Sequence, residues 1–460
     1  MMTLRFAARW PLWSIFTSFQ CLALVQTDWQ RQLLHQVNHT AHWMSKEFGP
    51  QLLDRLDRAD VRGLLARCCK EVAQLPAEAL VLELRKAVMA AEVVSGFSSE
   101  VNGSFFSFSL LEAEQVDHYE NLWEVWVRND VVNNYTHGFD WLETSFFGFK
   151  PFKEPAHPNS MEARERSAYF LLNSLRSDAG SPLYGDVSVV LKPSFAHATS
   201  ILSPLDSGSW AGWCHGSYSP PKPSYAHNCS AFPGHQGLGT FQALDHLFGI
   251  NEAYWSSPAA FLRPLARLLA GEDASTSMVG EDFVRYFEVL PTAEVTFSDV
   301  KFVIADFPSL FGTARGVAVR SWCQKNGWLL LWSLGLNVGF STNQGRPHFW
   351  DVFNQPGPFR GRSRLIDPEF LGPLQPWQNV SSDLDAFNAS WQLLQAKRGT
   401  ALPLKPKDFH FAWTALEGQL SPDLWITPVR ASCPDLDLCV GVTRKGCLCG
   451  AGGPPESVMI

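Results

Sequence analysis

The hydrophobic pattern of the chain changes its period along the sequence, and this change most constrains the fold. From residue 28 to 95, apolar residues recur at helical spacing, as Leu33 and Val37 do. Later, short apolar runs replace that spacing. The run from Tyr184 to Lys192 (YGDVSVVLK) is rich in Val and is stopped by Pro193. Helical stretches followed by separated strands favour an α+β fold. We expect a helical N-terminal layer, then a mixed domain with a small, mainly antiparallel sheet.

The central part of the chain gives the most definite local predictions. Ala168, Leu171 and Leu172 lie at the spacing of one helix face, and Asn326-Gly327 is a typical helix stop. We expect helices over residues 161–176, 298–304 and 313–325, and strands over residues 184–192, 283–290 and 328–333.

Pro and Gly clusters suggest the domain boundaries, the clearest of them at residues 148–160. We expect five segments: a signal peptide (1–25), a helical N-terminal region (26–150), a central α+β domain (151–340), a Pro- and Gly-rich C-terminal extension (341–430) and a Cys-containing tail (431–460).

The N-terminus has the pattern of a secretory signal. Arg5 and Arg9 precede an apolar run from Trp10 to Val25, and Cys21-Leu22-Ala23 offers small residues for cleavage. The run is shorter than the roughly 20 residues that a membrane span needs. The alternative interpretations are an uncleaved anchor and a buried first helix. After cleavage, no stable membrane span is expected, and the protein would be secreted or lie in the lumen of the secretory pathway.

Glycosylation motifs agree with that route. Asn-x-Ser/Thr acceptors are more frequent than the roughly two that chance would give, and they begin at Asn38, Asn102, Asn134, Asn228, Asn379 and Asn388.

Cysteine usage fits an oxidising compartment. Cys214 and Cys229 flank a Pro-rich loop, and we expect a disulfide between them. His215 and His227 lie in the same loop, but the spacing fits no familiar zinc module, so no metal site is predicted. The chain has 10 Cys. Loss of Cys21 with the signal would leave an odd number, and therefore at least one free or intermolecular thiol.

The composition of the chain limits the classes of partner that it can bind. The net charge is −8 and no long basic run opposes it, which excludes a nucleic-acid partner on electrostatic grounds. The 18 Trp and 33 Phe could stack on a glycan or a flat small molecule, or could simply fill the core. The chain has no P-loop, no GxSxG elbow and no HExxH motif.

Residues 161 to 335 resemble an uncharacterised domain family found in bacteria and some eukaryotes. The resemblance is carried by pieces in a fixed order: ER-x-x-Y-x-x-LN from Glu165 to Asn173, YGDVSVVLKP from Tyr184 to Pro193, Thr199, SPLDSG from Ser203 to Gly208, Gly239-Thr240, Asp245-His246-Leu247, Tyr286-Phe287-Glu288 and VTFSDVKFVIADFPSLFGT from Val295 to Thr313. The resemblance indicates a shared domain, but it assigns no reaction to that domain.

The order Arg, Ser/Thr, Glu along these pieces is similar to that of ADP-ribosyltransferase-like folds. The resemblance implies that Arg166 contacts a nicotinamide dinucleotide (NAD) and that Glu288 stabilises the oxocarbenium-like state as nicotinamide leaves. It also implies that Tyr169, Asn173, Tyr184 and Asp206 bind substrate. NAD would then be a substrate, and no other cofactor is expected.

Simpler interpretations stand beside these roles. Glu288 is followed by Val289-Leu290-Pro291, where the family has a more polar continuation, and a solvent-facing strand residue is the alternative. For Arg166, the alternative is a surface ion pair with Glu162, four residues earlier. Two function classes therefore remain: an enzyme acting on a nucleotide-like or glycosidic substrate, and a non-catalytic secreted binding or structural domain whose partner is a small molecule or a glycan.

Overall fold

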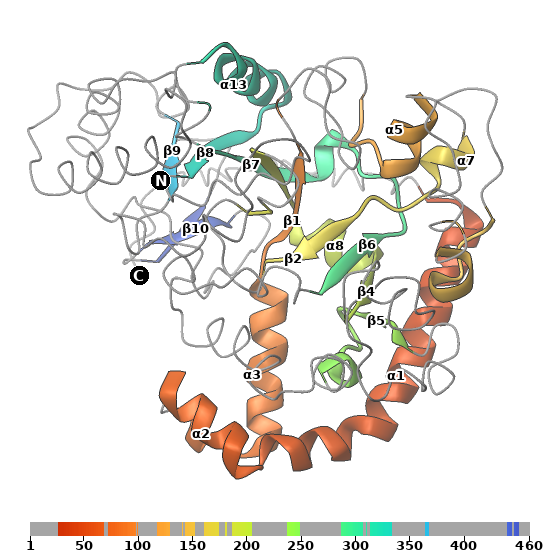
Figure 1. The fold of residues 1–460 in the computed structure, drawn as a ribbon, viewed down its shortest axis with the longest axis vertical. Coiled ribbons are helices and arrows are strands. Elements are labelled where there is room, and N and C mark those ends of the chain that lie inside the picture. Colours follow the sequence, from red (N-terminus) through yellow and green to blue (C-terminus); the bar gives the residue numbers. More distant parts are fainter. Residues whose placement is uncertain are drawn as a thin grey trace, which may run out of the picture.

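The computed structural model describes the parts of the chain that form one large sheet and the helices packed on it (Figure 1). The described residues are 26–68, 72–97, 99, 117–128, 140, 143–151, 161–173, 180–181, 186–204, 237–248, 287–306, 310, 313–333, 364–367, 439–443 and 446–449. The fold is α+β, as expected, with a mixed sheet.

The sheet has nine strands in the order β5-β4-β6-β2-β1-β3-β7-β8-β9, so it is larger than the small sheet expected. The strands are β1 (Val93–Phe97), β2 (Phe170–Leu172), β3 (Val187–Leu191), β4 (Ser200–Ser203), β5 (Gly239–Thr240), β6 (Glu288–Pro291), β7 (Val300–Asp306), β8 (Leu329–Ser333) and β9 (Arg364–Ile366). Among these nine strands only β7 and β8 pair in parallel, so the prediction of a mainly antiparallel sheet is confirmed.

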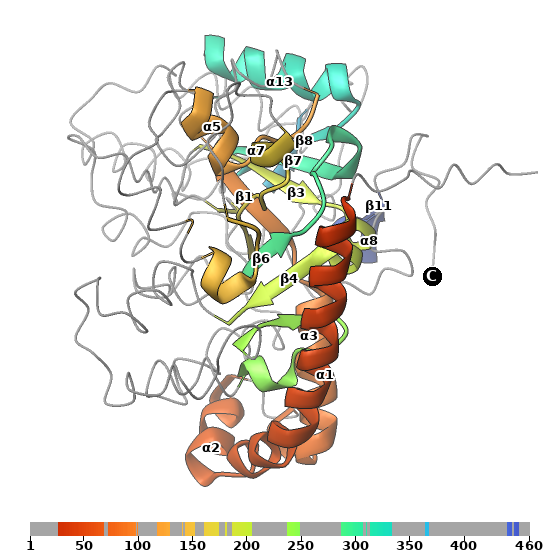
Figure 2. The same cartoon turned by 90° about the vertical axis from the view of Figure 1, so that its right-hand side faces the viewer.

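Helices from the N-terminal part of the chain cover one end of this sheet. They are α1 (Asp28–Leu56), α2 (Ala59–Cys68) and α3 (Ala77–Ala90). Helix α1 begins at a capping box between Thr27 and Gln30, and it contains Pro50. A proline removes one backbone hydrogen bond and bends a helix, and α1 curves towards α2 in its last turns (Figure 2).

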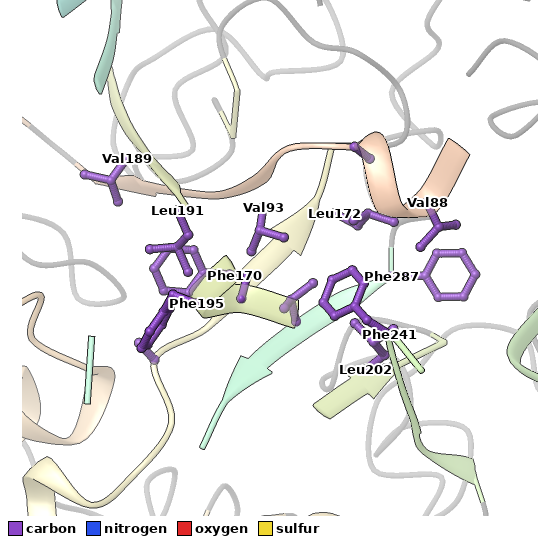
Figure 3. Close-up of a cluster of buried hydrophobic side chains, with 14 of the residues drawn as sticks. Val88, Val93, Phe170, Leu172, Val189, Leu191, Phe195, Leu202, Phe241 and Phe287 are labelled. Carbon is purple, nitrogen blue, oxygen red and sulfur yellow. The ribbon is translucent and has the colours of Figure 1, made fainter. Parts of the chain in front are cut away.

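One face of the sheet carries the main hydrophobic core. Side chains from β1, β2, β3 and β6 meet α3 and α8 (Pro193–Thr199) there, and α13 (Ala314–Asn326) extends the same core over β7 and β8. Figure 3 shows part of it, where Phe170, Leu191 and Phe195 gather from three elements. Each strand alternates its side chains between the two faces, so every second residue enters this core.

The opposite face carries a smaller core and several buried polar residues. Leu33 and Val37 of α1 pack there against Ile201 of β4 and Leu290 of β6. Val289, the neighbour of Leu290, belongs to the main core instead. The alternation therefore places Glu288 on the same face as Leu290.

Strand β7, helix α13 and strand β8 form a parallel crossover. Thr313 caps α13 by accepting from the N–H of Gly316, and Gly327 ends the helix with φ 69, which agrees with the predicted helix range and stop. Asp306 and Ser333 end the two strands as register partners, so the carboxyl ends of both strands lie at the same edge.

Two local predictions are wrong. Residues 161–176 were expected to be one helix, but within the described residues 161–173 the helix is confined to α7 (Met161–Arg164), and Phe170–Leu172 is strand β2. Residues 298–304 were also expected to be helical. They begin in the 3₁₀ turn η7 (Phe297–Asp299), which Thr296 caps, and then form β7. Both segments are strands buried on both faces, where a short apolar run has no period that distinguishes strand from helix.

The sheet draws strands from more than one expected segment. β1 belongs to the expected N-terminal region, and it lies between β2 and β3 of the expected central domain. β9 comes from the expected C-terminal extension. In the expected tail, β10 (Cys439–Thr443) and β11 (Gly446–Cys449) form a separate antiparallel pair. The expected signal peptide lies outside the described residues.

The remaining elements are short. They are the 3₁₀ turn η1 (Val72–Gln74), helix α5 (Leu122–Arg128) and the single-turn π-helix η2 (Glu143–Phe147). In the part of the chain that the structure describes, no helix is both long and apolar enough to cross a bilayer.

Candidate functional site

A fully buried carboxylate, Glu143, organises the polar cluster nearest to the predicted catalytic residues. The indole N–H of Trp123 lies 3.0 Å from each of its oxygens. The Tyr169 hydroxyl donates to Oε1, and the Arg166 guanidinium donates to Oε2. Glu143 is the first residue of the π-helix η2, and such turns are frequent at functional sites. We call Glu143, Arg166, Tyr169 and Trp123 the Glu143 cluster.

Arg166 is a buried cation held by protein groups. It is 5% exposed, and its second terminal nitrogen lies 2.5 Å from Oδ1 of Asp140. Its guanidinium also lies 4.9 Å from the ring centroid of Trp123, which is cation–π geometry. Arg166 is therefore not a surface residue, as the alternative interpretation assumed, because it is buried between Asp140 and Glu143.

Tyr169 connects this cluster to Glu288. Burial, followed by the nearby charges of Glu143 and Glu288, raises the pKa of the Tyr169 phenol well above its usual value. The charge of Glu288 acts on Tyr169 because both residues lie on the face of the sheet opposite the main core. The phenol is therefore a neutral hydrogen-bond donor beside two acids.

Glu288 lies in the interior of the sheet. It is 4% exposed and begins β6, where its register partners are Leu171 of β2 and Ser203 of β4. The alternative of a solvent-facing strand residue is wrong, since the carboxylate is buried. Its carboxylate lies on the face opposite Phe287 and Val289, which belong to the main core.

Burial is the largest influence on the pKa of the Glu143 carboxyl. Removal from water raises the pKa of its carboxyl, while the charge of Arg166 and the bonds from Tyr169 and Trp123 act in the opposite direction. The carboxyl oxygens face only donors in these three contacts. The cluster is thus a compact network in which an acid, a phenol and a guanidinium are fixed by one another.

The other predicted binding residues do not all join this cluster. Asn173 lies just beyond the far end of β2, where its side-chain amide donates to Glu92 at 3.0 Å. Tyr184 and Asp206 lie outside the described residues. The structure therefore brings Arg166 and Tyr169 together at Glu143. Glu288 pairs with Leu171, midway between Tyr169 and Asn173, so Asn173 is distant from the Glu143 cluster but not from Glu288.

Most predicted modification sites also fall outside the described residues. These are Cys214 and Cys229 of the expected disulfide, and Asn102, Asn134, Asn228, Asn379 and Asn388 of the glycosylation motifs. Asn38 is described: it lies within α1, half-buried, and its Oδ1 accepts from the Thr240 hydroxyl at 2.6 Å. Cys323 is a free thiol buried in the main core, where burial raises its pKa.

A second polar cluster has the residue types of a metal site. The ligand atoms of Asp117, His118 and Glu294 lie within 4.8 Å of one another. Arg164 already donates to Glu294, and it also approaches His118. Although burial opposes the charge on His118, bonds to Glu124 and Asp117 outweigh that effect and raise its pKa to about 9. In this structure the contacts among Asp117, His118, Glu294 and Arg164 are those of an ion-pair network.

Sequence reasoning missed the centre of the site. Glu143, Asp140 and Trp123 were not predicted as functional residues, although one signal was available. Glu143 is a lone acid in the run from Trp141 to Phe149 (WLETSFFGF), and an acid in an aromatic run must find a buried partner. Arg166, which donates to Glu143, was predicted to contact NAD or to form a surface ion pair with Glu162, but not to hold a buried acid.

Comparison with known proteins adds no relative. No protein-family model matches the chain, and a search of curated proteins finds no match either.

Proposed function

We propose that this protein is an enzyme of ADP-ribosyltransferase-like type, acting on a nucleotide-like or glycosidic substrate, with NAD as the first candidate. The observation that carries the proposal is the strand order β4-β6-β2. It sets the Ser/Thr strand, the Glu strand and the strand that follows Arg166 side by side, so the three pieces that carry the resemblance are neighbours in the sheet. Glu288 lies between Ser203 and Leu171 in this arrangement.

In the proposed reaction, the bond between C1′ of the ribose and the pyridinium nitrogen of nicotinamide breaks. Its electron pair leaves with the nitrogen, so nicotinamide departs neutral and positive charge develops at C1′. The carboxylate of Glu288 stabilises that charge in a site shielded from water. A water molecule, or a nucleophile of an acceptor, then forms the new bond to C1′ and releases a proton.

The other residues divide between binding and positioning. Arg166 donates to Asp140 and Glu143, so we assign it a positioning role: it holds Glu143, which in turn holds the hydroxyl of Tyr169. Tyr184 and Asp206 keep the substrate-binding roles that the resemblance implies. Asn173 is held by Glu92, which makes it the weakest of the proposed binding residues.

The second candidate function is a non-catalytic binding or structural domain, with a small molecule or a glycan as its partner. It is favoured by the burial of Glu288 and by the two carboxylates on Arg166. A site that only stabilises the fold needs no access for a substrate.

For either function we propose a secreted glycoprotein. The apolar N-terminal run and the excess of glycosylation motifs support this route. The first capped helix begins at Asp28, just beyond the proposed cleavage region.

The decisive experiment compares Glu288→Gln with wild type by nicotinamide release from NAD. We expect release by the wild type and a loss on the order of 10²-fold in the variant, because the shape is kept and the charge is removed. The matched control is Glu165→Gln, which makes the same change at a part-buried residue that accepts from Trp29.

Equal loss in both variants, or loss accompanied by a lower melting temperature, would count against a catalytic Glu288. If the wild type neither releases nicotinamide nor binds NAD, the non-catalytic function replaces this proposal.

A further inference from the structure

Three histidines follow one side of helix α1 at intervals of four and three residues. They are His35, His39 and His42, and all three side chains are exposed to solvent. Residues three and four positions apart lie on the same side of a helix, so these imidazoles form one row. The opposite side of α1, with Leu33 and Val37, packs into the smaller core beside β4 (Figure 2). The row is therefore fixed on the outer side of the helix.

No protein group in the described part of the chain holds these three rings. Within it, His35, His39 and His42 take part in no hydrogen bond, ion pair or ring contact. By contrast, His118 and His246 are buried, and both ring nitrogens of each have partners. Each ring of the row, when neutral, therefore keeps a nitrogen lone pair available for a ligand.

The helix spacing allows His35 and His39 to share one metal ion. Cβ atoms four residues apart on a helix lie about 5–6 Å from each other. An ion bound at about 2.0–2.1 Å from each imidazole nitrogen fits between two such side chains. His42 lies seven residues beyond His35, about 10 Å along the axis, so the three rings cannot hold one ion together. In agreement, their ring nitrogens do not gather within 4.8 Å of one another in the described structure.

Charges along the row favour its His35 end as the cation site. Lys46 is exposed one turn beyond His42, and its ammonium group opposes a second cation there. Arg31 lies one turn before His35, but its guanidinium is paired with Asp28. The positive end of the helix dipole falls off within the first turn, and His35 lies beyond that turn.

We propose that His35 and His39 bind a divalent transition-metal ion, with Cu²⁺ held more tightly than Zn²⁺. Imidazole nitrogen suits these two ions, and Cu²⁺ exceeds Zn²⁺ in affinity for a given site, whereas Mg²⁺ and Ca²⁺ take oxygen ligands. Two protein ligands leave the other positions of the ion open to water. His35 is followed by Gln36, not by the glutamate that acts as general base in the HExxH motif, so this is a binding site and not a protease centre.

This site is separate from the proposed catalytic one. Glu288 is buried within the sheet, on the face that the inner side of α1 covers, whereas His35 and His39 lie on the outer side of that helix. Metal binding can therefore be present or absent whatever the fate of the enzymatic proposal.

The test is calorimetric titration of the untagged, chelator-treated full-length chain with CuSO₄ and ZnCl₂, and with MgCl₂ as the hard-cation control. We expect Cu²⁺ to bind more tightly than Zn²⁺ and Mg²⁺ to give no binding heat. His35→Gln and His39→Gln should each weaken binding by at least about tenfold, since even residues outside the ligand shell cost that much. The matched control is His42→Gln, the same change in the same row, and it should bind like wild type.

Trp43 gives a second readout that leaves the ligands intact. It is 51% exposed and lies one turn beyond His39. Because Cu²⁺ quenches the fluorescence of a nearby indole, Cu²⁺ should lower the emission of wild type by more than that of Trp43→Phe. The histidine variants should fold like wild type, since all three positions are exposed and glutamine forms helix at least as well as histidine.

The proposal is overturned if neither Cu²⁺ nor Zn²⁺ binds at submillimolar concentration, which would leave the row as a solvated helix face only. It is also overturned if His39→Gln binds like wild type, or if His42→Gln weakens binding as much as His35→Gln does. Equal quenching of wild type and Trp43→Phe would place the ion elsewhere and would overturn it too.

Discussion

Glu143 matters more to the molecule than its position in the sequence indicates. Its buried carboxylate accepts from Trp123, Arg166 and Tyr169, so its removal leaves three donors without their acceptor. We expect Glu143→Ala to lower the free energy of unfolding by about 3–5 kcal/mol, since it leaves a buried cation poorly compensated. Urea denaturation measures this change. Glu47→Ala, at an exposed position of α1, should stay within about 0.5 kcal/mol. Similar losses in both variants would contradict the central role of Glu143.

His118 makes the stability of the fold depend on pH on the alkaline side. Its pKa is raised to about 9 in the fold, against about 6.5 in an unfolded chain. The stabilisation is complete below the unfolded pKa and is lost as pH rises through about 9. We expect the free energy of unfolding of wild type to fall over that window, and His118→Gln to show a smaller fall. Identical alkaline profiles for the two proteins would exclude this assignment.

His246 produces the opposite trend on the acidic side. Burial lowers its pKa to about 4, and it is neutral, with Nε2–H donating to the Leu238 carbonyl and Nδ1 facing the Ser45 hydroxyl. Its stabilisation is complete above the unfolded pKa of about 6.5 and is lost as pH falls through about 4. Urea denaturation at several acidic pH values should therefore show a weaker pH dependence for His246→Gln. An unchanged slope would refute this.

At the scale of elements, the sequence predicted what local chemistry specifies. Strands β3 and β8 and helix α13 lie where they were expected, because Val-rich runs, the Thr313 cap and the Gly327 stop act within a few residues. Strand β2 was mistaken for a helix because its apolar residues serve both faces of the sheet. The Glu143 cluster was missed for a related reason: its partners are far apart in sequence and meet only in the folded chain.

Strand β1 approaches the segment at residues 180–181 so closely that it requires a glycine. A Cβ built on Gly96 would lie 2.0 Å from the carbonyl oxygen of Ser181, a backbone atom that cannot turn aside. We expect Gly96→Ala to destabilise the protein by at least about 1–3 kcal/mol, the usual range for overpacking. The measurement is thermal or urea unfolding of the purified variant.

Gly63 in α2 is the matched control for Gly96, because nothing lies within 4 Å of a Cβ built there. Gly63→Ala should stabilise the protein by about 0.4–1 kcal/mol, since alanine favours helix and restricts the unfolded chain. If Gly96→Ala were neutral, the close approach of β1 to Ser181 would be wrong.

At the scale of the whole molecule, the proposed secretory route makes a prediction about glycans. Expressed in a eukaryotic secretory host, the chain should lose its N-terminus and shrink on deglycosylation. Among the acceptors, we expect Asn38 to be unmodified, because its amide oxygen is held by Thr240. Peptide mapping by mass spectrometry checks both points. An intact Met1 without a mobility shift would exclude secretion, and full occupancy of Asn38 would contradict its packing.

The central place of β1 also bears on how the chain is made. Synthesis delivers β1 long before β6, β7 and β8, yet β1 lies between β2 and β3, and the sheet continues from them through β6 and β7. A nascent chain that ends near residue 150 exposes both edges of this apolar strand, and open edges invite pairing with other chains. Most of the strands must therefore leave the ribosome before the edges of β1 are covered and protected from aggregation. We expect chaperones to bind the early chain until then.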